Sequence, residues 1–170
     1  MASISFIIPS VNRESLHRTV ASIEVRKGDE VLVEYDLPPT GRWGNDQRNK
    51  AMARAIGDYL AFIDDDDSYV PCHRQIMEDA ITENPGKPIL FRMQYPDGRY
   101  VWKVKSIYPG NVGSPMILVP NDKKMLYKWF SGRNMADYIF IRNWGWKDEE
   151  VVWSDKIIAL LGHNNERLPI

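Results

Sequence analysis

The sequence predicts an α/β protein whose N-terminal half contains a mainly parallel sheet. Three short, nearly continuous apolar runs, at residues 4–8, 31–33 and 59–63, are typical of strands that are buried on both faces. Helical patterns at about residues 12–27 and 46–56 separate these runs. Strands that alternate with helices need crossover connections, and such connections produce parallel pairing. The first 67 residues are therefore expected to form a strand–helix–strand–helix–strand unit.

The two helices of this unit have recognisable ends. Asn12 is expected to cap the first helix, because a short polar side chain can accept a hydrogen bond from the free backbone N–H groups there. Apolar residues recur along this helix at the helical period, at Leu16, Val20 and Ile23. Gly57 follows the second helix in a position typical of a C-cap.

After about residue 84 the pattern becomes mixed, because strand signals are no longer separated by regular helices. Tyr95-Pro96-Asp97-Gly98 has the composition of a hairpin turn. The elements expected in this half are a helix opened by Pro71, hairpin strands at 89–91 and 100–102, a strand at 116–119 and a helix near 121–130.

The composition fits one globular domain over residues 1–170, with a nucleotide-binding half (1–70) and a smaller acceptor-side half (71–170). Hydrophobic residues at 44% and charged residues at 26% exclude disordered and collagen-like classes. A net charge of −1 argues against a partner nucleic acid held by bulk electrostatics. The single cysteine, Cys72, fits a reducing compartment, and no apolar run approaches the ~18 residues of a membrane helix. The N-terminus also lacks the basic segment of a secretory signal, so a soluble, cytoplasmic protein without a membrane partner is expected.

Polar residues gather where the three expected parallel strands end, at residues 9–12, 34–36 and 64–67. Ligands of open α/β sheets bind at this edge. Residues 64–67 are four aspartates, whose charges repel one another unless a cation neutralises them. In an extended chain Asp64 and Asp66 would point to the same side, and their oxygens suit Mn²⁺ or Mg²⁺. The alternative is a solvated acidic turn.

Two stretches of the chain carry a family signature. Residues 4–13 read ISFIIPSVNR, and residues 47–67 read QRNKAMARAIGDYLAFIDDDD. Together they resemble the opening strand and turn, and the helix, strand and Asp-x-Asp motif, of GT-A glycosyltransferases of the inverting family-2 type. The resemblance is strong over residues 4–75 and weaker beyond them. It implies a GT-A fold and a metal-dependent transfer of sugar from a nucleotide-diphosphate sugar, with UDP favoured, to an acceptor hydroxyl.

The resemblance also implies which residues bind the donor and the metal. Asp36 would contact the base or ribose, although the family usually has paired aspartates where this chain has Glu34-Tyr35-Asp36. Arg42 would contact the base or a phosphate, or be a solvated loop residue. Asp66 would be the main metal ligand, joined by His163 unless that histidine is structural. The remaining donor contacts implied by the resemblance are Pro9, Ser10 and Asn12 at the nucleoside, and Asp64 and Asp65 at the ribose or the metal.

On the acceptor side the resemblance implies a general base about seventy residues after the metal motif. Asp137 is the match, and the alternative is that it caps a helix. The family often has Glu before this aspartate, whereas this chain has Ala136. Trp144 and Trp146 are candidates for stacking on the acceptor, with core packing as the alternative.

Two other functions compete with the transferase. A sugar-phosphate nucleotidyltransferase usually has a glycine-rich, basic loop after the first strand, and Ser10-Val11-Asn12-Arg13 disfavours it. A non-catalytic nucleotide- or sugar-binding module is favoured by the short chain and by Ala136. The acceptor stays open among a protein, a modified nucleobase, a glycan and a metabolite.

Overall fold

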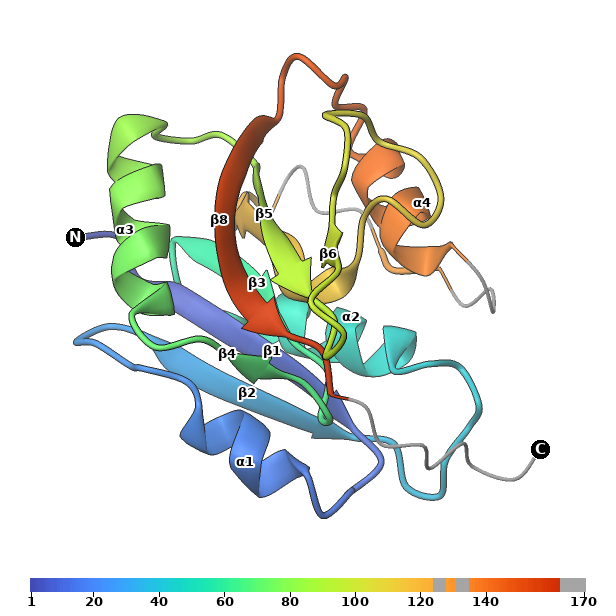
Figure 1. Cartoon of the computed structure of the whole chain (residues 1–170). Coiled ribbons are helices and arrows are strands. Elements are labelled where there is room, and N and C mark those ends of the chain that lie inside the picture. Colours follow the sequence, from blue (N-terminus) through green and yellow to red (C-terminus); the bar gives the residue numbers. More distant parts are fainter. Residues whose placement is uncertain (124–127, 131–134, 163–170) are drawn as a thin grey trace.

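The computed structural model describes residues 1–123, 128–130 and 135–162. Its strands join in one mixed sheet, which Figure 1 shows as a strongly curved surface. The strands are β1 (Ile4–Ser10), β2 (Glu30–Tyr35), β3 (Tyr59–Phe62), β4 (Ser68–Tyr69), β5 (Ile89–Gln94), β6 (Tyr100–Val101), β7 (Ile117–Pro120) and β8 (Val152–Leu160). Their order is β2-β1-β3-β7-β5-β8-β4, with β6 paired to β5.

The N-terminal part of the sheet is parallel, as predicted. β1 lies between β2 and β3 and pairs in parallel with both, with Ser10 opposite Tyr35 and Ile7 opposite Phe62. Every residue of β1 is buried, which is why residues 6–8 at its centre are apolar without alternation. Helix α2 (Asn45–Arg54) packs against β1 and β2. The three strands end at one edge, so the segments that follow them come together there.

The first helix differs from the prediction. α1 comprises Leu16–Ala21, and Ser15 rather than Asn12 occupies the N-cap position. Asn12 is exposed and has a φ of 64°, a left-handed conformation that asparagine tolerates better than most residues. Val20 is 38% exposed, whereas Thr19 is fully buried and donates a hydrogen bond to the Asp67 carbonyl (2.7 Å). The periodic pattern of apolar residues assigned Val20 to the buried face, but the buried Thr19 makes the contact that holds this helix against the aspartates.

The C-terminal half is mixed, as predicted. β7 is antiparallel to β3 and to β5, while β8 runs parallel to β5 and antiparallel to β4. β5 and β6 form the expected hairpin, with Met93 opposite Val101. Of the helix expected near 121–130, residues 124–127 lie outside the described residues, and 121–123 and 128–130 are not helical. The helical elements here are α3 (His73–Glu83), η1 (Ser114–Met116) and α4 (Ala136–Asn143).

Gly44 precedes α2 and lies against β1. Its φ is 71°, and a Cβ at this position would lie 2.5 Å from the Pro9 Cβ. Gly41 has the same φ of 71°, but no atom lies within 4 Å of its Cβ position. Both Gly→Ala substitutions therefore carry the cost of a left-handed backbone, and only Gly44→Ala adds a steric clash.

We expect Gly44→Ala to lower the free energy of unfolding by about 1–3 kcal/mol more than Gly41→Ala does. Urea denaturation of the two variants measures this difference directly. Equal losses in the two variants would show that the close approach of Gly44 to Pro9 does not contribute.

Candidate active site

The four aspartates form a turn and do not continue β3. The Asp67 N–H donates to the Asp64 carbonyl (3.1 Å), which closes a turn over Asp65 and Asp66. The expectation that Asp64 and Asp66 share one side rested on an extended chain, and this extended conformation is wrong. Because the chain turns, the four carboxylates have different surroundings. We call residues 64–67 the aspartate turn.

Asp65 fastens the loop after β1 to the aspartate turn. Its carboxylate is buried and accepts hydrogen bonds from the Ser10 hydroxyl (2.7 Å) and from the Val11 N–H (3.1 Å). The Arg13 guanidinium donates to both Asp65 (3.0 Å) and Asp66 (2.7 Å). Ser10 and Asp65, both predicted donor contacts, thus lie together at the strand ends. Arg13 joins them there without having been assigned a role from the sequence.

A buried arginine supports the other end of the aspartate turn. Arg48, on α2, is 4% exposed and forms an ion pair with Asp64. Its guanidinium also donates to the Trp43 carbonyl (2.8 Å) and lies 4.7 Å from the centroid of the Trp129 ring. This places a fixed positive charge at the base of the site. Arg48 is missing from the predicted site residues, and its one sequence signal is its position inside the family motif on a mostly polar helix.

Asp137 lies close to the aspartate turn although it is about seventy residues away in sequence. It belongs to the first turn of α4 and accepts a hydrogen bond from the Ser114 hydroxyl. The same hydroxyl lies 3.4 Å from the Asp64 carboxylate. Burial and, to a lesser extent, the charge of Asp64 raise the pKa of Asp137 to about 6, against the opposing effects of Arg48 and the Ser114 hydrogen bond. A carboxylate with such a pKa can accept a proton near neutral pH.

The aspartate turn carries more negative charge than its arginines neutralise. Burial raises the pKa of Asp66, and the charges of Asp64 and Asp65 add to this although Arg13 opposes it. Burial and the neighbouring carboxylates raise the pKa of Asp67 to about 8, although the Gly162 N–H donates to its carboxylate (2.8 Å). A cation bound at the turn would relieve this repulsion.

The donor set fits a hard divalent cation only in part. In residues 1–123, 128–130 and 135–162, no three His, Cys, Asp or Glu side chains are grouped so that they alone could hold a metal ion. Asp64 and Asp66 offer the oxygen ligands that Mg²⁺ and Mn²⁺ prefer, and a bound phosphate could supply others. His163, the other predicted ligand, lies outside the described residues.

The other predicted donor contacts have structural roles or lie at the surface. The buried Asp36 carboxylate accepts hydrogen bonds from the N–H and the hydroxyl of Thr40, both at 3.0 Å. Pro9 is buried in β1, and Asn12 is exposed on the loop after it. Arg42 lies exposed in the loop before α2 and pairs with Asp46, four residues later (2.9 Å), as the solvated alternative predicts.

The two predicted acceptor-side tryptophans differ in exposure. Trp144 is 4% exposed and packs edge-on against the buried Phe140, which stacks in turn on Trp129. This position fits the core-packing alternative for Trp144. Trp146 is only partly buried, and its ring centroid lies 4.4 Å from that of Trp144. Of the two, Trp146 keeps an accessible face for a ligand.

Comparison with known proteins identifies the family. The family model "Glycosyl transferase family 2" matches residues 31–144. The chain belongs to this family. No match was found among curated proteins.

Solved structures of S. aureus TarS have a similar fold. TarS superposes with a TM-score of 0.76 at 17% identity, over 96% of this chain and 37% of that chain. A complex of TarS 1–349 with UDP-GlcNAc gives a TM-score of 0.72 at 18% identity, over 97% of this chain and 60% of that chain. The predicted GT-A fold is thereby confirmed, and this chain spans 37% to 60% of the length of these structures. In the part of this chain that the structure describes, no helix is both long and apolar enough to cross a membrane.

Proposed function

We propose that this chain is a metal-dependent, inverting glycosyltransferase that moves a sugar from a nucleotide-diphosphate sugar to an acceptor hydroxyl. The observation that carries the proposal is the position of Asp137, whose pKa is raised to about 6, beside Asp64 and Arg48 at the strand ends. Membership of glycosyl transferase family 2 supports the reaction class. The TarS structures in complex with UDP and with UDP-GlcNAc support a uridine donor.

In this proposal Asp137 is the general base. Its carboxylate takes the proton of the acceptor hydroxyl while the hydroxyl oxygen attacks the anomeric carbon of the donor sugar. The attack comes from the face opposite the diphosphate, so the configuration inverts. The bond between the anomeric carbon and the diphosphate oxygen breaks, and its electron pair leaves with the diphosphate. Ser114 donates to the Asp137 carboxylate and so orients it for this role.

The aspartate turn would hold the cofactor, Mn²⁺ or Mg²⁺. Asp66 is the proposed main ligand, with Asp64 beside it and with His163 as a further candidate. When bound, the cation supplies Lewis-acid stabilisation of the charge on the departing diphosphate. Arg13 fixes Asp65 and Asp66 relative to each other, and it thereby keeps the turn in one arrangement. Ser10 and Asp65 hold the loop after β1, which would bind the nucleoside.

Calorimetric titration of UDP and of GDP, each with Mn²⁺ and with EDTA, tests the donor side of this proposal. We expect UDP to bind with Mn²⁺ and to bind about tenfold or more weakly with EDTA or when replaced by GDP. If folded protein binds neither nucleotide, the proposal is wrong. A non-catalytic binding module would bind UDP equally well, but would release no UDP from UDP-GlcNAc under any condition.

A further inference from the structure

Asp67 is the carboxylate of the aspartate turn to which the proposed function gives no role. Asp64 and Asp66 are the candidate metal ligands, and Asp65 holds the loop after β1. Asp67 differs from Asp64 and Asp66 in being only 5% exposed. A buried carboxylate is costly unless hydrogen bonds compensate the loss of water, so the partner of Asp67 indicates what this residue does.

The Asp67 carboxylate binds the chain that follows β8. It accepts a hydrogen bond from the N–H of Gly162, 95 residues later in the sequence (2.8 Å). The backbone of Asp67 is held as well. Its carbonyl accepts a hydrogen bond from the Thr19 hydroxyl on α1 (2.7 Å), and its N–H donates to the Asp64 carbonyl (3.1 Å). Asp67 therefore joins α1, the aspartate turn and the end of β8.

Gly162 lies against the backbone of the aspartate turn more closely than a side chain would allow. A Cβ at this position would lie 1.5 Å from the Asp66 carbonyl oxygen and 2.5 Å from the Asp66 carbonyl carbon. Gly162 is not one of the glycines with a positive φ, so the close approach, and not the backbone conformation, requires glycine here. The hydrogen bond to Asp67 thus holds Gly162 against Asp66.

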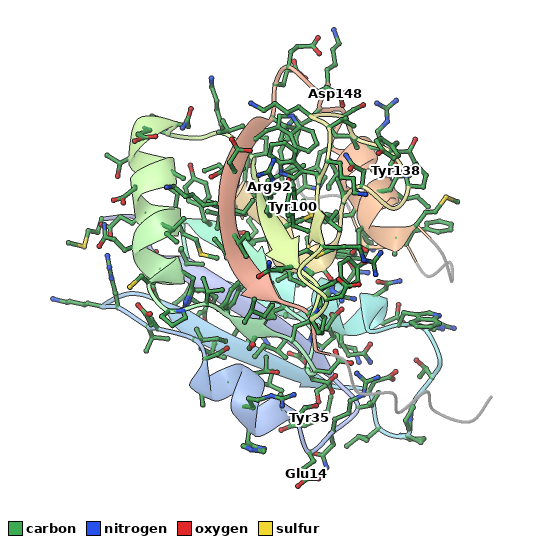
Figure 2. All side chains as sticks on the ribbon, viewed as in Figure 1. Glu14, Tyr35, Arg92, Tyr100, Tyr138 and Asp148 are labelled. Atoms are coloured by element: carbon green, nitrogen blue, oxygen red, sulfur yellow. The ribbon has the colours of Figure 1, made fainter. Side chains whose placement is uncertain are left out.

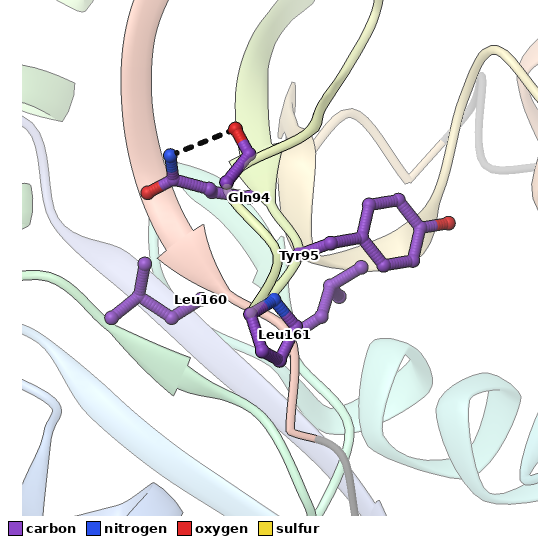
Figure 3. A pocket seen from close by; sticks show the side chains of 6 residues that line it. Gln94, Tyr95, Leu160 and Leu161 are labelled. Atoms are coloured by element: carbon purple, nitrogen blue, oxygen red, sulfur yellow. Dashed lines mark hydrogen bonds between the residues drawn. The ribbon is translucent and has the colours of Figure 1, made fainter.

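Strand β8 itself is held by β5 and does not depend on this contact. Asp155 on β8 pairs with Arg92 on β5 (2.9 Å), and the Arg92 guanidinium lies 4.4 Å from the Tyr100 ring centroid, as Figure 2 shows. Beyond β8, the Leu161 N–H donates to the Gln94 carbonyl (2.8 Å), and Figure 3 shows both residues at the ends of these strands. Loss of the bond to the aspartate turn would therefore leave β8 paired.

We propose that Asp67 is a positioning residue for the metal site, which holds Gly162 against Asp66 and so fixes Asp66 for the cation. This inference rests on the proposed function, which places the cation at Asp66. The same bond also fixes the point from which His163, the further candidate ligand, continues, because His163 follows Gly162 directly in the sequence. The cation is bound by the neighbours of Asp67 and not by Asp67 itself.

Paired substitutions at Asp67 separate its hydrogen bond from its charge. Asp67→Asn loses the charge, but its amide oxygen can still accept from the Gly162 N–H, whereas Asp67→Ala loses both. The measurement is calorimetry of UDP binding with Mn²⁺ and with EDTA. With Mn²⁺, we expect Asp67→Ala to bind UDP about tenfold more weakly and Asp67→Asn to stay within about threefold of the wild type. In EDTA, both variants should bind UDP as the wild type does.

Gly162→Ala tests the same contact from the other side. The added Cβ has no room beside the Asp66 carbonyl, so this variant should reproduce the loss expected for Asp67→Ala. Asp58→Ala is the matched control, because the Asp58 carboxylate likewise accepts a hydrogen bond from a distant backbone N–H, that of Ser3 (2.8 Å). Asp58 precedes β3, at the end of the strand opposite the aspartate turn, and its loss should leave UDP binding unchanged.

Hydrogen exchange of the Gly162 amide, followed by NMR without nucleotide or metal, measures the bond to Asp67 directly. This amide should be protected in the wild type and in Asp67→Asn, and should exchange about tenfold faster or more in Asp67→Ala. An unprotected Gly162 amide in the wild type would overturn the proposal.

The binding data can overturn the proposal in three ways. Equal losses in Asp67→Asn and Asp67→Ala would make the charge of Asp67, and not its hydrogen bond, the contribution to the metal site. A loss as large in EDTA as with Mn²⁺ would make the role of Asp67 purely structural. Unchanged UDP binding in both Asp67→Ala and Gly162→Ala would show that the contact does not position the site.

Circular dichroism identifies a variant that has lost its fold, and the other of Asp67→Ala and Gly162→Ala then decides. The wild-type titration separates this inference from the proposed function. A folded wild-type chain that binds no UDP would remove the proposed function and this inference with it. Mn²⁺-dependent UDP binding together with any of the three patterns above would remove the inference alone.

Discussion

Asp137→Asn is expected to lower the turnover of donor by about 10²- to 10⁴-fold while leaving nucleotide affinity nearly unchanged. Asparagine has the shape of aspartate and can still accept the hydrogen bond from Ser114, but it cannot take a proton from the acceptor hydroxyl. UDP release from UDP-GlcNAc, with water as the acceptor where no other is known, measures the loss. Calorimetry with UDP measures the binding that should persist.

The pH dependence of the same reaction is a second test of Asp137 as the general base. Burial raises the pKa of this carboxyl to about 6, so lowering the pH through 6 protonates the base and should remove activity. The wild-type rate is therefore expected to rise with pH up to about 6 and to level above it, and Asp137→Asn should lose this rise. Asp79→Asn, at an exposed carboxylate on α3, is the matched control and should keep both the rate and its pH profile. Full activity in Asp137→Asn would remove Asp137 from the mechanism.

The place of the aspartates could be predicted from the sequence, but the direction of their side chains could not. Continuous apolar runs identified β1, β2 and β3, and parallel pairing then brings the strand ends together. The turn at Asp65 and Asp66 depends instead on bonds to Ser10 and Arg13, more than fifty residues earlier. The rule that side chains alternate along an extended chain takes no account of such distant partners. It therefore predicted alternating side-chain directions for a segment that is in fact a turn.

Arg48 and the pairing of β8 were not predicted, for related reasons. Arginine is rarely buried, and the sequence does not show that Asp64 and the Trp129 ring surround Arg48. The pairing of β8 with β5 on one side and with β4 on the other is likewise a long-range choice that the sequence does not show. Asp137 could be predicted because the family resemblance relates a carboxylate at this distance in sequence to the metal motif, whereas the periodicity of apolar residues does not.

Asp66→Ala is expected to abolish the part of UDP binding that depends on Mn²⁺. Burial, together with the neighbouring carboxylates, raises the pKa of Asp66 and Asp67, and this crowding of negative charge is the electrostatic basis for a cation there. In the variant, UDP affinity with Mn²⁺ should fall to the wild-type value in EDTA, a loss of about tenfold or more. Arg13 keeps its ion pair with Asp65, so the turn should persist.

Calorimetry with and without Mn²⁺ tests this expectation, with Asp79→Ala as the control for the loss of an exposed carboxylate elsewhere. If Asp66→Ala keeps its wild-type affinity for UDP with Mn²⁺ present, Asp66 is not the metal ligand. Asp64→Ala then becomes the deciding variant, because Asp64 is the more exposed of the two carboxylates, with a side chain 38% exposed against 27% for Asp66. Retained Mn²⁺ dependence in both variants would place the cation away from the aspartate turn.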